Sequence, residues 1–95
     1  MRVTVEFVGL PELRKTIGSK SLRVSLDRGT MGDLLSQLER MYGAPVRNSL
    51  LDSKGNIHET IQVIRNGREW LARDNPMAEL RDGDRITFLL MVAGG

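Results

Sequence analysis

An apolar run near the end of the chain limits the fold more than any other feature. Residues 86–92 read ITFLLMV and include no charged side chain. Such a strand is apolar on both faces, and strands of that kind usually lie in the interior of a sheet. The segment DGD at 82–84 has the composition of a tight turn and would start the strand. We therefore expect the last strand to have a neighbouring strand on each side.

Two further strands are predicted near the start of the chain. Residues 3–7 (VTVEF) and 22–26 (LRVSL) alternate apolar and polar side chains, which is the period of a half-buried strand. The connecting segment 9–21 holds two glycines, one proline and several charges, a composition typical of a loop. The two strands should pair as an antiparallel hairpin. The first strand should also lie parallel to the last, because both apolar segments need neighbours.

The clearest element is an amphipathic helix in TMGDLLSQLERMYG, residues 30–43. Thr30 is a good N-cap, and Asp33 three residues later completes a pattern like a capping box. Gly43 suits the left-handed position that follows a helix, and Pro45 would prevent the helix from continuing. The apolar side chains form one stripe along this helix, made of Met31, Leu34, Leu35, Leu38, Met41 and Tyr42.

The signal is weaker in the second half of the chain before the last strand. Residues 61–71 read IQVIRNGREWL, which predicts two short strands around Asn66-Gly67, a dipeptide suited to a type I′ turn. Residues 72–80 read as a loop. The segment 46–60 has no clear period, and its candidates for the core are Leu50, Leu51 and Ile57.

The order of these elements predicts an α+β fold in which a mixed sheet packs on one main helix. A chain of 95 residues is enough for one domain and too short for two. We expect that domain to span residues 1–91, followed by a flexible tail over 92–95.

The composition argues against several classes of function. The chain has no cysteine, which excludes disulfides and thiolate chemistry. Its net charge is only +2, and the charges of both signs are interspersed, so nucleic acid is not an expected partner. No apolar run approaches the roughly 20 residues that span a bilayer. We expect a cytoplasmic protein that does not contact membranes.

The side chains offer little catalytic chemistry. His58 is the only histidine, and it has no evident nucleophile or metal-ligand partner in the sequence. Asp82 and Asp84 flank a glycine but lack the remaining ligands of a calcium loop, so turn formation explains them better. We therefore expect no metal site and no catalytic side chain.

The C-terminal segment VAGG offers a different kind of chemistry. Two terminal glycines arise by chance in about one chain in 200. Glycine has no Cβ, so a tail of small residues can thread a narrow slot. Four extended residues reach about 13 Å beyond the sheet. The reactive group at the end of this tail would be the α-carboxylate of Gly95.

These features together resemble the MoaD/ThiS family of sulfur carriers, which have the ubiquitin-like β-grasp fold. The matching features are the N-terminal strand pair, the helix at 30–43, the VIRNG turn, the DGD turn and the terminal Gly94-Gly95. The length and the VAGG ending are most similar to the small subunit of molybdopterin synthase.

The resemblance implies a function for the tail. The Gly95 carboxylate would be adenylated by an enzyme of the ubiquitin-activating type, which uses ATP and magnesium, and this chain would bind no cofactor itself. A persulfide donor would then convert the adenylate to a thiocarboxylate. Val92, Ala93 and Gly94 would form the threading tail. The acceptor would be the large subunit of molybdopterin synthase, acting on a pterin precursor of the molybdenum cofactor.

The family also uses an apolar surface beside the tail to dock its enzymes, which implies a partner-binding role for Phe88, Leu89 and Met91. A strand has a period of two, so Ile86, Phe88 and Leu90 are expected to face the helix and Leu89 and Met91 to face away.

Three alternatives remain open from the sequence. The same activated tail could form isopeptide bonds, as in a ubiquitin-like protein modifier. The sulfur could serve another product, such as thiamine, cysteine or the tungsten cofactor. The chain could also be a non-conjugating β-grasp interaction domain.

Overall fold

The protein is a mixed sheet with helices packed on one face. The computed structural model describes residues 1–91, so the expectation of a flexible tail at 92–95 lies outside the described residues. The elements follow the order β1 (Arg2–Val8), α1 (Pro11–Ile17), β2 (Ser21–Ser25), α2 (Met31–Tyr42), α3 (Ala44–Leu50), β3 (Ile61–Arg65), β4 (Glu69–Leu71) and β5 (Arg85–Leu90).

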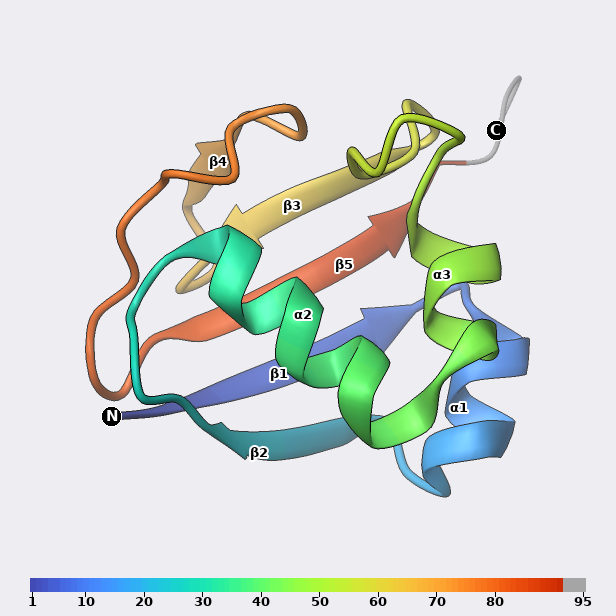
Figure 1. The fold of residues 1–95 in the computed structure, drawn as a ribbon, viewed down its shortest axis with the longest axis horizontal. Helices are drawn as coiled ribbons and strands as arrows, with labels where there is room; N and C mark the ends of the chain where they lie inside the picture. The colour runs from blue at the N-terminus through green and yellow to red at the C-terminus, as the bar shows by residue number, and fades with distance from the viewer. Residues whose placement is uncertain (92–95) are drawn as a thin grey trace.

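The last strand lies in the middle of the sheet. The strand order is β2-β1-β5-β3-β4, with β5 parallel to β1 and antiparallel to β3. β1 and β2 form the expected antiparallel pair. β1 and β5 run side by side toward the end of the sheet at which α1 and α3 lie (Figure 1). The predicted central, parallel placement of the first and last strands is confirmed.

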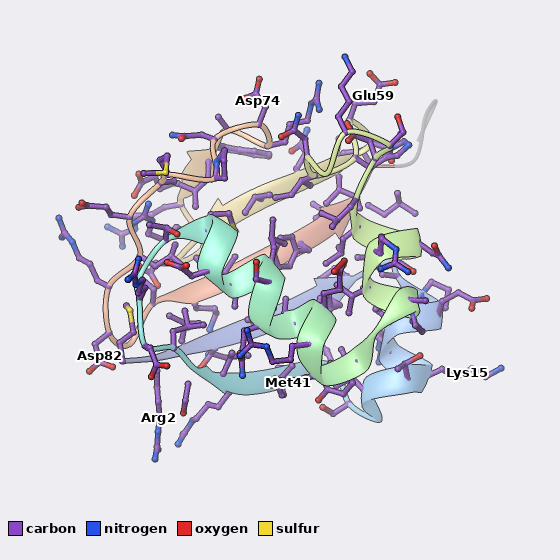
Figure 2. The ribbon with its side chains drawn as sticks, viewed as in Figure 1. Arg2, Lys15, Met41, Glu59, Asp74 and Asp82 are labelled. Carbon is purple, nitrogen blue, oxygen red and sulfur yellow. The ribbon has the colours of Figure 1, made fainter. Side chains whose placement is uncertain are left out.

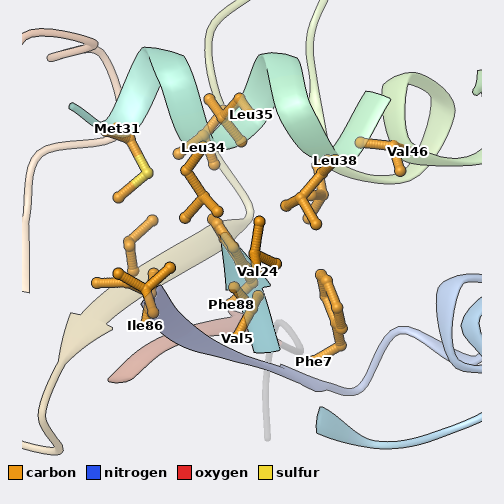
Figure 3. Close-up of a cluster of buried hydrophobic side chains, with 14 of the residues drawn as sticks. Val5, Phe7, Val24, Met31, Leu34, Leu35, Leu38, Val46, Ile86 and Phe88 are labelled. Carbon is orange, nitrogen blue, oxygen red and sulfur yellow. The ribbon is translucent and has the colours of Figure 1, made fainter. Parts of the chain in front are cut away.

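The main helix, α2, crosses one face of this sheet and supplies much of the core. Met31, Leu34, Leu35 and Leu38 project from α2 toward the strands (Figure 3). They meet a layer of fully buried strand residues, which includes Val3, Val5, Phe7, Val24, Ile86 and Phe88. The predicted stripe is wrong at Met41, whose side chain is 43% exposed.

The first turn of α2 is held by its own cap and by a distant loop. Asp33 N–H donates to the Thr30 hydroxyl oxygen, and Thr30 N–H donates to the Asp33 carboxylate, so the predicted capping box is present. The N–H groups of Met31 and Gly32 donate to the carbonyls of Ala78 and Pro76. The loop between β4 and β5 therefore satisfies donors that a helix N-terminus leaves free.

Residues 9–21 contain a helix, so the expectation of a plain loop is wrong. α1 begins with Pro11, whose fixed φ suits the first turn of a helix. It ends at Gly18, which has φ 86° and ψ 3° and whose N–H donates to the Arg14 carbonyl. Leu13 is fully buried in the core. Seven residues with one buried position give too weak a period to be read without the tertiary contacts.

A second short helix, α3, lies in the segment where the sequence signal was weak. Pro45 does end α2, but it also lies in the first turn of α3. Gly43 joins the two helices with φ 73° and ψ −142°, a glycine conformation that differs from the left-handed one expected. Val46 and Leu50 of α3 are fully buried, and Leu50 and Ile57 belong to the core as predicted.

The two predicted turns are present and are joined by a polar network. Asn66 and Gly67 both have positive φ, as a type I′ turn requires. The Asp84 carboxylate, almost fully buried, accepts hydrogen bonds from Asn66 Nδ2 at 3.0 Å and from Arg81 N–H at 2.9 Å. It also lies 3.5 Å from Arg65 Nη1. This network connects the β3–β4 turn to the start of β5.

The capping box predicts a pH-dependent contribution to stability. The hydrogen bond from the Thr30 hydroxyl, followed by that from its backbone N–H, holds the pKa of Asp33 below the ordinary aspartate value of 3.8. A depressed pKa in the folded state means that the contribution is present above pH 3.8 and is lost as pH falls through the folded pKa. Asp33→Asn should therefore lower the free energy of unfolding near pH 7 and change it much less at low pH.

Urea denaturation of both proteins at several pH values measures this difference. Asp74→Asn, at an exposed loop position, is the matched control and should behave like the parent chain at every pH. A constant difference between the Asp33→Asn variant and the parent across that range would contradict the assignment.

Candidate functional site

β5 divides its side chains between the core and the opposite face of the sheet. Ile86 and Phe88 are fully buried beneath the helices, and the Phe88 ring stacks on Phe7 with centroids 5.8 Å apart. Thr87 and Leu89 face the other way and are only partly buried. The predicted alternation is confirmed. The expectation that Phe88 contacts a partner is wrong, because its side chain has no exposed surface in the folded domain.

The outer face of the sheet, away from α2, carries an apolar patch. Val8 lies beside Leu89 on the neighbouring strand, and Ile64 lies beside Trp70. Val8 is 36% exposed and Trp70 62% exposed. Met91, two residues beyond Leu89, is 46% exposed. We call these residues the outer patch: Val8, Ile64, Trp70, Leu89 and Met91.

The remainder of the outer face is polar. Arg23 and Arg85 both lie beside Thr4, on either side of β1. Arg85 pairs with Glu6 at 3.1 Å, and its side chain is 59% exposed. The arginines therefore lie toward the start of β5, whereas Leu89 and Met91 lie at its end. A partner that covers the whole face would need an apolar region against the outer patch and acidic groups against the arginines.

The chain leaves the sheet at Met91, next to the apolar half of this face. Met91 N–H donates to the Thr60 carbonyl at 2.8 Å, which extends the β3–β5 ladder one step beyond Leu90. Glu59 lies at this end of the molecule, and Arg2 and Asp82 lie at the other (Figure 2). The predicted site residues Val92, Ala93, Gly94 and Gly95 follow directly in the sequence and lie outside the described residues.

The other polar candidates have structural roles. Asp82 accepts a hydrogen bond from Arg2 N–H at 2.7 Å, which fits the predicted turn. His58 is exposed, and its Nδ1 lies 2.8 Å from the Thr60 hydroxyl oxygen. Within residues 1–91, no group of three or more His, Asp or Glu side chains is placed to hold a metal ion. One polar hollow, lined in part by Asp27, Ser36 and Arg40, lies between the end of β2 and α2.

A central strand that ends beside an exposed apolar patch and continues into VAGG is the arrangement expected of the sulfur-carrier family. Sequence comparison tests that expectation directly, and the ThiS family matches residues 10–95. The chain belongs to the ThiS family.

Individual members of known function are also similar over most of their length. Small archaeal modifier protein 3 of Haloferax volcanii is 36% identical over 84 residues, which cover 86% of this chain and 88% of that protein. Sulfur carrier protein CysO of Mycobacterium tuberculosis is 32% identical, and the match covers 100% of both chains.

Solved structures of the family confirm the ubiquitin-like β-grasp fold. The crystal structure of M. tuberculosis CysO has a TM-score of 0.72 at 32% identity, covering 95% of this chain and 99% of that one. The CysO chain of the Amycolatopsis orientalis BexX/CysO complex has a TM-score of 0.73 at 30% identity, covering 98% and 99%. The resemblance inferred from the sequence is therefore correct at the level of the family, and the nearness to molybdopterin synthase is only approximate.

The structure adds residues that the sequence did not indicate as a site. Val8 and Ile64 join the outer patch because they lie on the two strands that pair with β5, and Trp70 joins it because it pairs with Ile64. The predicted hairpin at Asn66-Gly67 was a partial signal in the sequence, because a turn at that dipeptide places Ile64 opposite Trp70. The described residues also include no helix long and apolar enough to cross a membrane.

Adjacent residues of β5 should differ sharply in their contribution to stability. Phe88→Ala removes a fully buried ring and should cost about 3–5 kcal/mol. Leu89→Ala removes a half-buried side chain from the outer patch and should cost only about 1 kcal/mol. Guanidinium denaturation of both variants measures the difference. Equal losses would show that the outer face is also part of the core.

Proposed function

We propose that this protein is a sulfur carrier whose reactive group is the carboxylate of Gly95. The observation that carries the proposal is the 32% identity to a named sulfur carrier protein over 100% of both chains. The structure supports it physically, because Met91, four residues before the carboxylate, is bonded through its N–H to the Thr60 carbonyl at the end of the sheet. A short tail that starts from a rigid strand reaches about 13 Å when it is extended.

A carboxylate needs activation before sulfur can be attached. Its negative charge repels nucleophiles, so a partner enzyme would use ATP and magnesium to convert it into an acyl-adenylate, releasing pyrophosphate. The terminal sulfur of a persulfide donor then attacks the carbonyl carbon and expels AMP, which leaves an acyl disulfide. A thiol of the donor breaks the S–S bond and leaves the Gly95 thiocarboxylate together with a donor disulfide.

The chain itself contributes the tail and the docking surface to this sequence of steps. ATP and the metal ion belong to the activating enzyme, and the persulfide belongs to the donor. The outer patch would dock each partner in turn, since it includes Leu89 of the strand that leads into the tail and Val8 of the strand beside it. A pterin precursor of the molybdenum cofactor is the acceptor expected from the sequence, and thiamine, cysteine and tungsten-cofactor precursors fit the same chemistry.

A protein modifier is the second candidate, because small archaeal modifier protein 3 is 36% identical to this chain. The two functions share the acyl-adenylate and differ only in the nucleophile that attacks it. A persulfide gives a thiocarboxylate, whereas a lysine amine gives an isopeptide bond. Intact mass separates them, since a modifier gives a ladder of larger species that thiol reduction does not remove.

The proposed chemistry predicts a defined mass change. The protein incubated with ATP, magnesium, its adenylating enzyme and a persulfide donor should gain the mass that replaces one oxygen by sulfur, and fragmentation should place it on Gly95. Gly94→Val should reduce the yield, because a branched Cβ does not fit a narrow slot. Adding one residue after Gly95 should abolish the product by moving the carboxylate.

Circular dichroism provides the control for these variants. Neither change touches the described core, so thermal unfolding should match the parent chain. If the extended tail is processed as well as the native tail, the slot argument is wrong. If the parent chain forms no adenylate with any adenylating enzyme of the same organism, the interaction-domain alternative is the better account.

The outer patch makes a separate prediction about binding. Leu89→Asp places a charge in the apolar half of the outer face and should weaken the affinity for the adenylating enzyme by about tenfold or more, because a buried unpaired charge is costly. Thr87→Asp, two residues earlier on the same face and next to Ile64, is the matched control and should have a smaller effect. Titration calorimetry measures both affinities. Unfolding of the Leu89→Asp variant would instead assign Leu89 to the core.

A further inference from the structure

The last two described residues, Leu90 and Met91, are held from both sides, and we call them the tail root. On one side Met91 N–H donates to the Thr60 carbonyl at 2.8 Å. On the other side the chain turns out of β1 at Gly9, directly against Leu90. These are the last contacts before the segment that carries the reactive carboxylate.

Gly9 leaves room that any other residue would fill. Its φ is +75°, which L-residues rarely adopt. A Cβ added at Gly9 would lie 3.3 Å from the Leu90 Cβ and 3.6 Å from the Leu90 carbonyl oxygen. The absence of a side chain at this position therefore lets the β1–α1 connection pass close to the tail root.

On the side of the tail root away from Gly9, a short series of hydrogen bonds runs from α3 through His58 and Thr60 to Met91. His58 N–H donates to the Leu50 carbonyl at the end of α3, at 2.7 Å. The Thr60 N–H donates to His58 Nδ1 at 3.2 Å, and the Thr60 carbonyl accepts from Met91. The imidazole thus fixes the residue to which the tail root is bonded. The Nδ1 atom must be an acceptor here, which puts the proton of the neutral ring on Nε2.

We propose that Gly9 and His58 are positioning residues for the sulfur-carrying carboxylate, acting through the tail root. This inference rests on the proposed function. Gly9 allows the close contact with Leu90, and His58 orients the Thr60 carbonyl that binds Met91. Neither residue touches a reacting atom. Together they set the position and direction in which the chain leaves the sheet.

The length of the free tail matters because the carboxylate must reach a remote active site. A root that opens adds freely rotating residues to the tail and enlarges the volume that the carboxylate samples. Fewer encounters then place it in line with the α-phosphate of ATP, and small misplacements of a reacting group can lower a rate by about 100-fold. The other four residues of the outer patch lie within the paired strands and would still dock the enzyme, so the effect should fall mainly on kcat rather than on KM.

Hydrogen exchange tests the structural part without any partner. In His58→Ala the Met91 amide should exchange about tenfold faster than in the parent chain, because the acceptor that bonds it is no longer oriented. The Phe88 amide, in the middle of β5, should be unchanged. His58→Asn should restore slow exchange, because an asparagine side-chain oxygen accepts from the N–H two residues later in the same way. Equal exchange at Met91 in all three proteins would overturn the role of His58.

Adenylation kinetics test the functional part. Gly9→Ala should lower kcat for adenylate formation by about tenfold or more at unchanged KM. Gly18→Ala is the matched control, because Gly18 has φ +86° and nothing within 4 Å of an added Cβ. An alanine at position 18 would have a similar backbone strain from its positive φ, but at a position that does not contact the tail root. His58→Ala should behave like Gly9→Ala, and His58→Asn should recover most of the rate.

The outcomes separate this inference from the proposed function. If the parent chain forms no adenylate, the proposed function fails. The hydrogen-exchange result then still tests whether His58 holds Met91, because it needs no partner. If the parent chain is active and Gly9→Ala matches Gly18→Ala, the role of Gly9 is overturned. If Gly9→Ala does not fold, the pair of His58 variants decides whether the tail root positions the carboxylate.

Discussion

The pairing of β5 between β1 and β3 is the constraint on which the rest of the structure depends. Each neighbour contributes a register of five residue pairs, and one is parallel while the other is antiparallel. A strand in this position must cross the core, and its inner residues Ile86 and Phe88 are fully buried there. The same backbone also presents Leu89 on the outer face and ends beside Thr60. One strand therefore supplies residues to the core and to the outer patch and leads directly into the tail root.

The connections around β5 are held by polar groups as well as by the apolar packing of Leu80. The buried Asp84 carboxylate joins the start of β5 to the β3–β4 turn, and the loop before it satisfies the first N–H groups of α2. A buried carboxylate is tolerated only with such partners, because an unpaired charge in the core would be expelled or neutralised. These contacts fix the strand at its beginning, while Gly9 and Thr60 hold it at its end. The strand is therefore restrained at both of its ends.

A strand that is fixed at both ends would suit the proposed sulfur carrier, whose reactive group belongs to the backbone. A terminal carboxylate needs no side chain to assist it, so the fold has only to present it and to offer a surface by which partners are recognised. The outer face combines the apolar outer patch with arginines toward the start of β5. A carrier of sulfur and a protein modifier would need the same arrangement, since both pass through an activated carboxylate. Relatives of this chain carry both names, small archaeal modifier protein and sulfur carrier protein.

The sequence by itself determined the elements whose signal is local. The apolar run at 86–92 indicated a central strand, the Thr30–Asp33 pattern indicated the start of α2, and Asn66-Gly67 indicated a hairpin. Only the tertiary structure decided the rest. The helices at Pro11–Ile17 and Ala44–Leu50 are too short to show a period, and the core contacts of a few residues stabilise them. Phe88 and Leu89 are both apolar in the sequence, and pairing within the sheet alone determines which one is buried and which one a partner can reach.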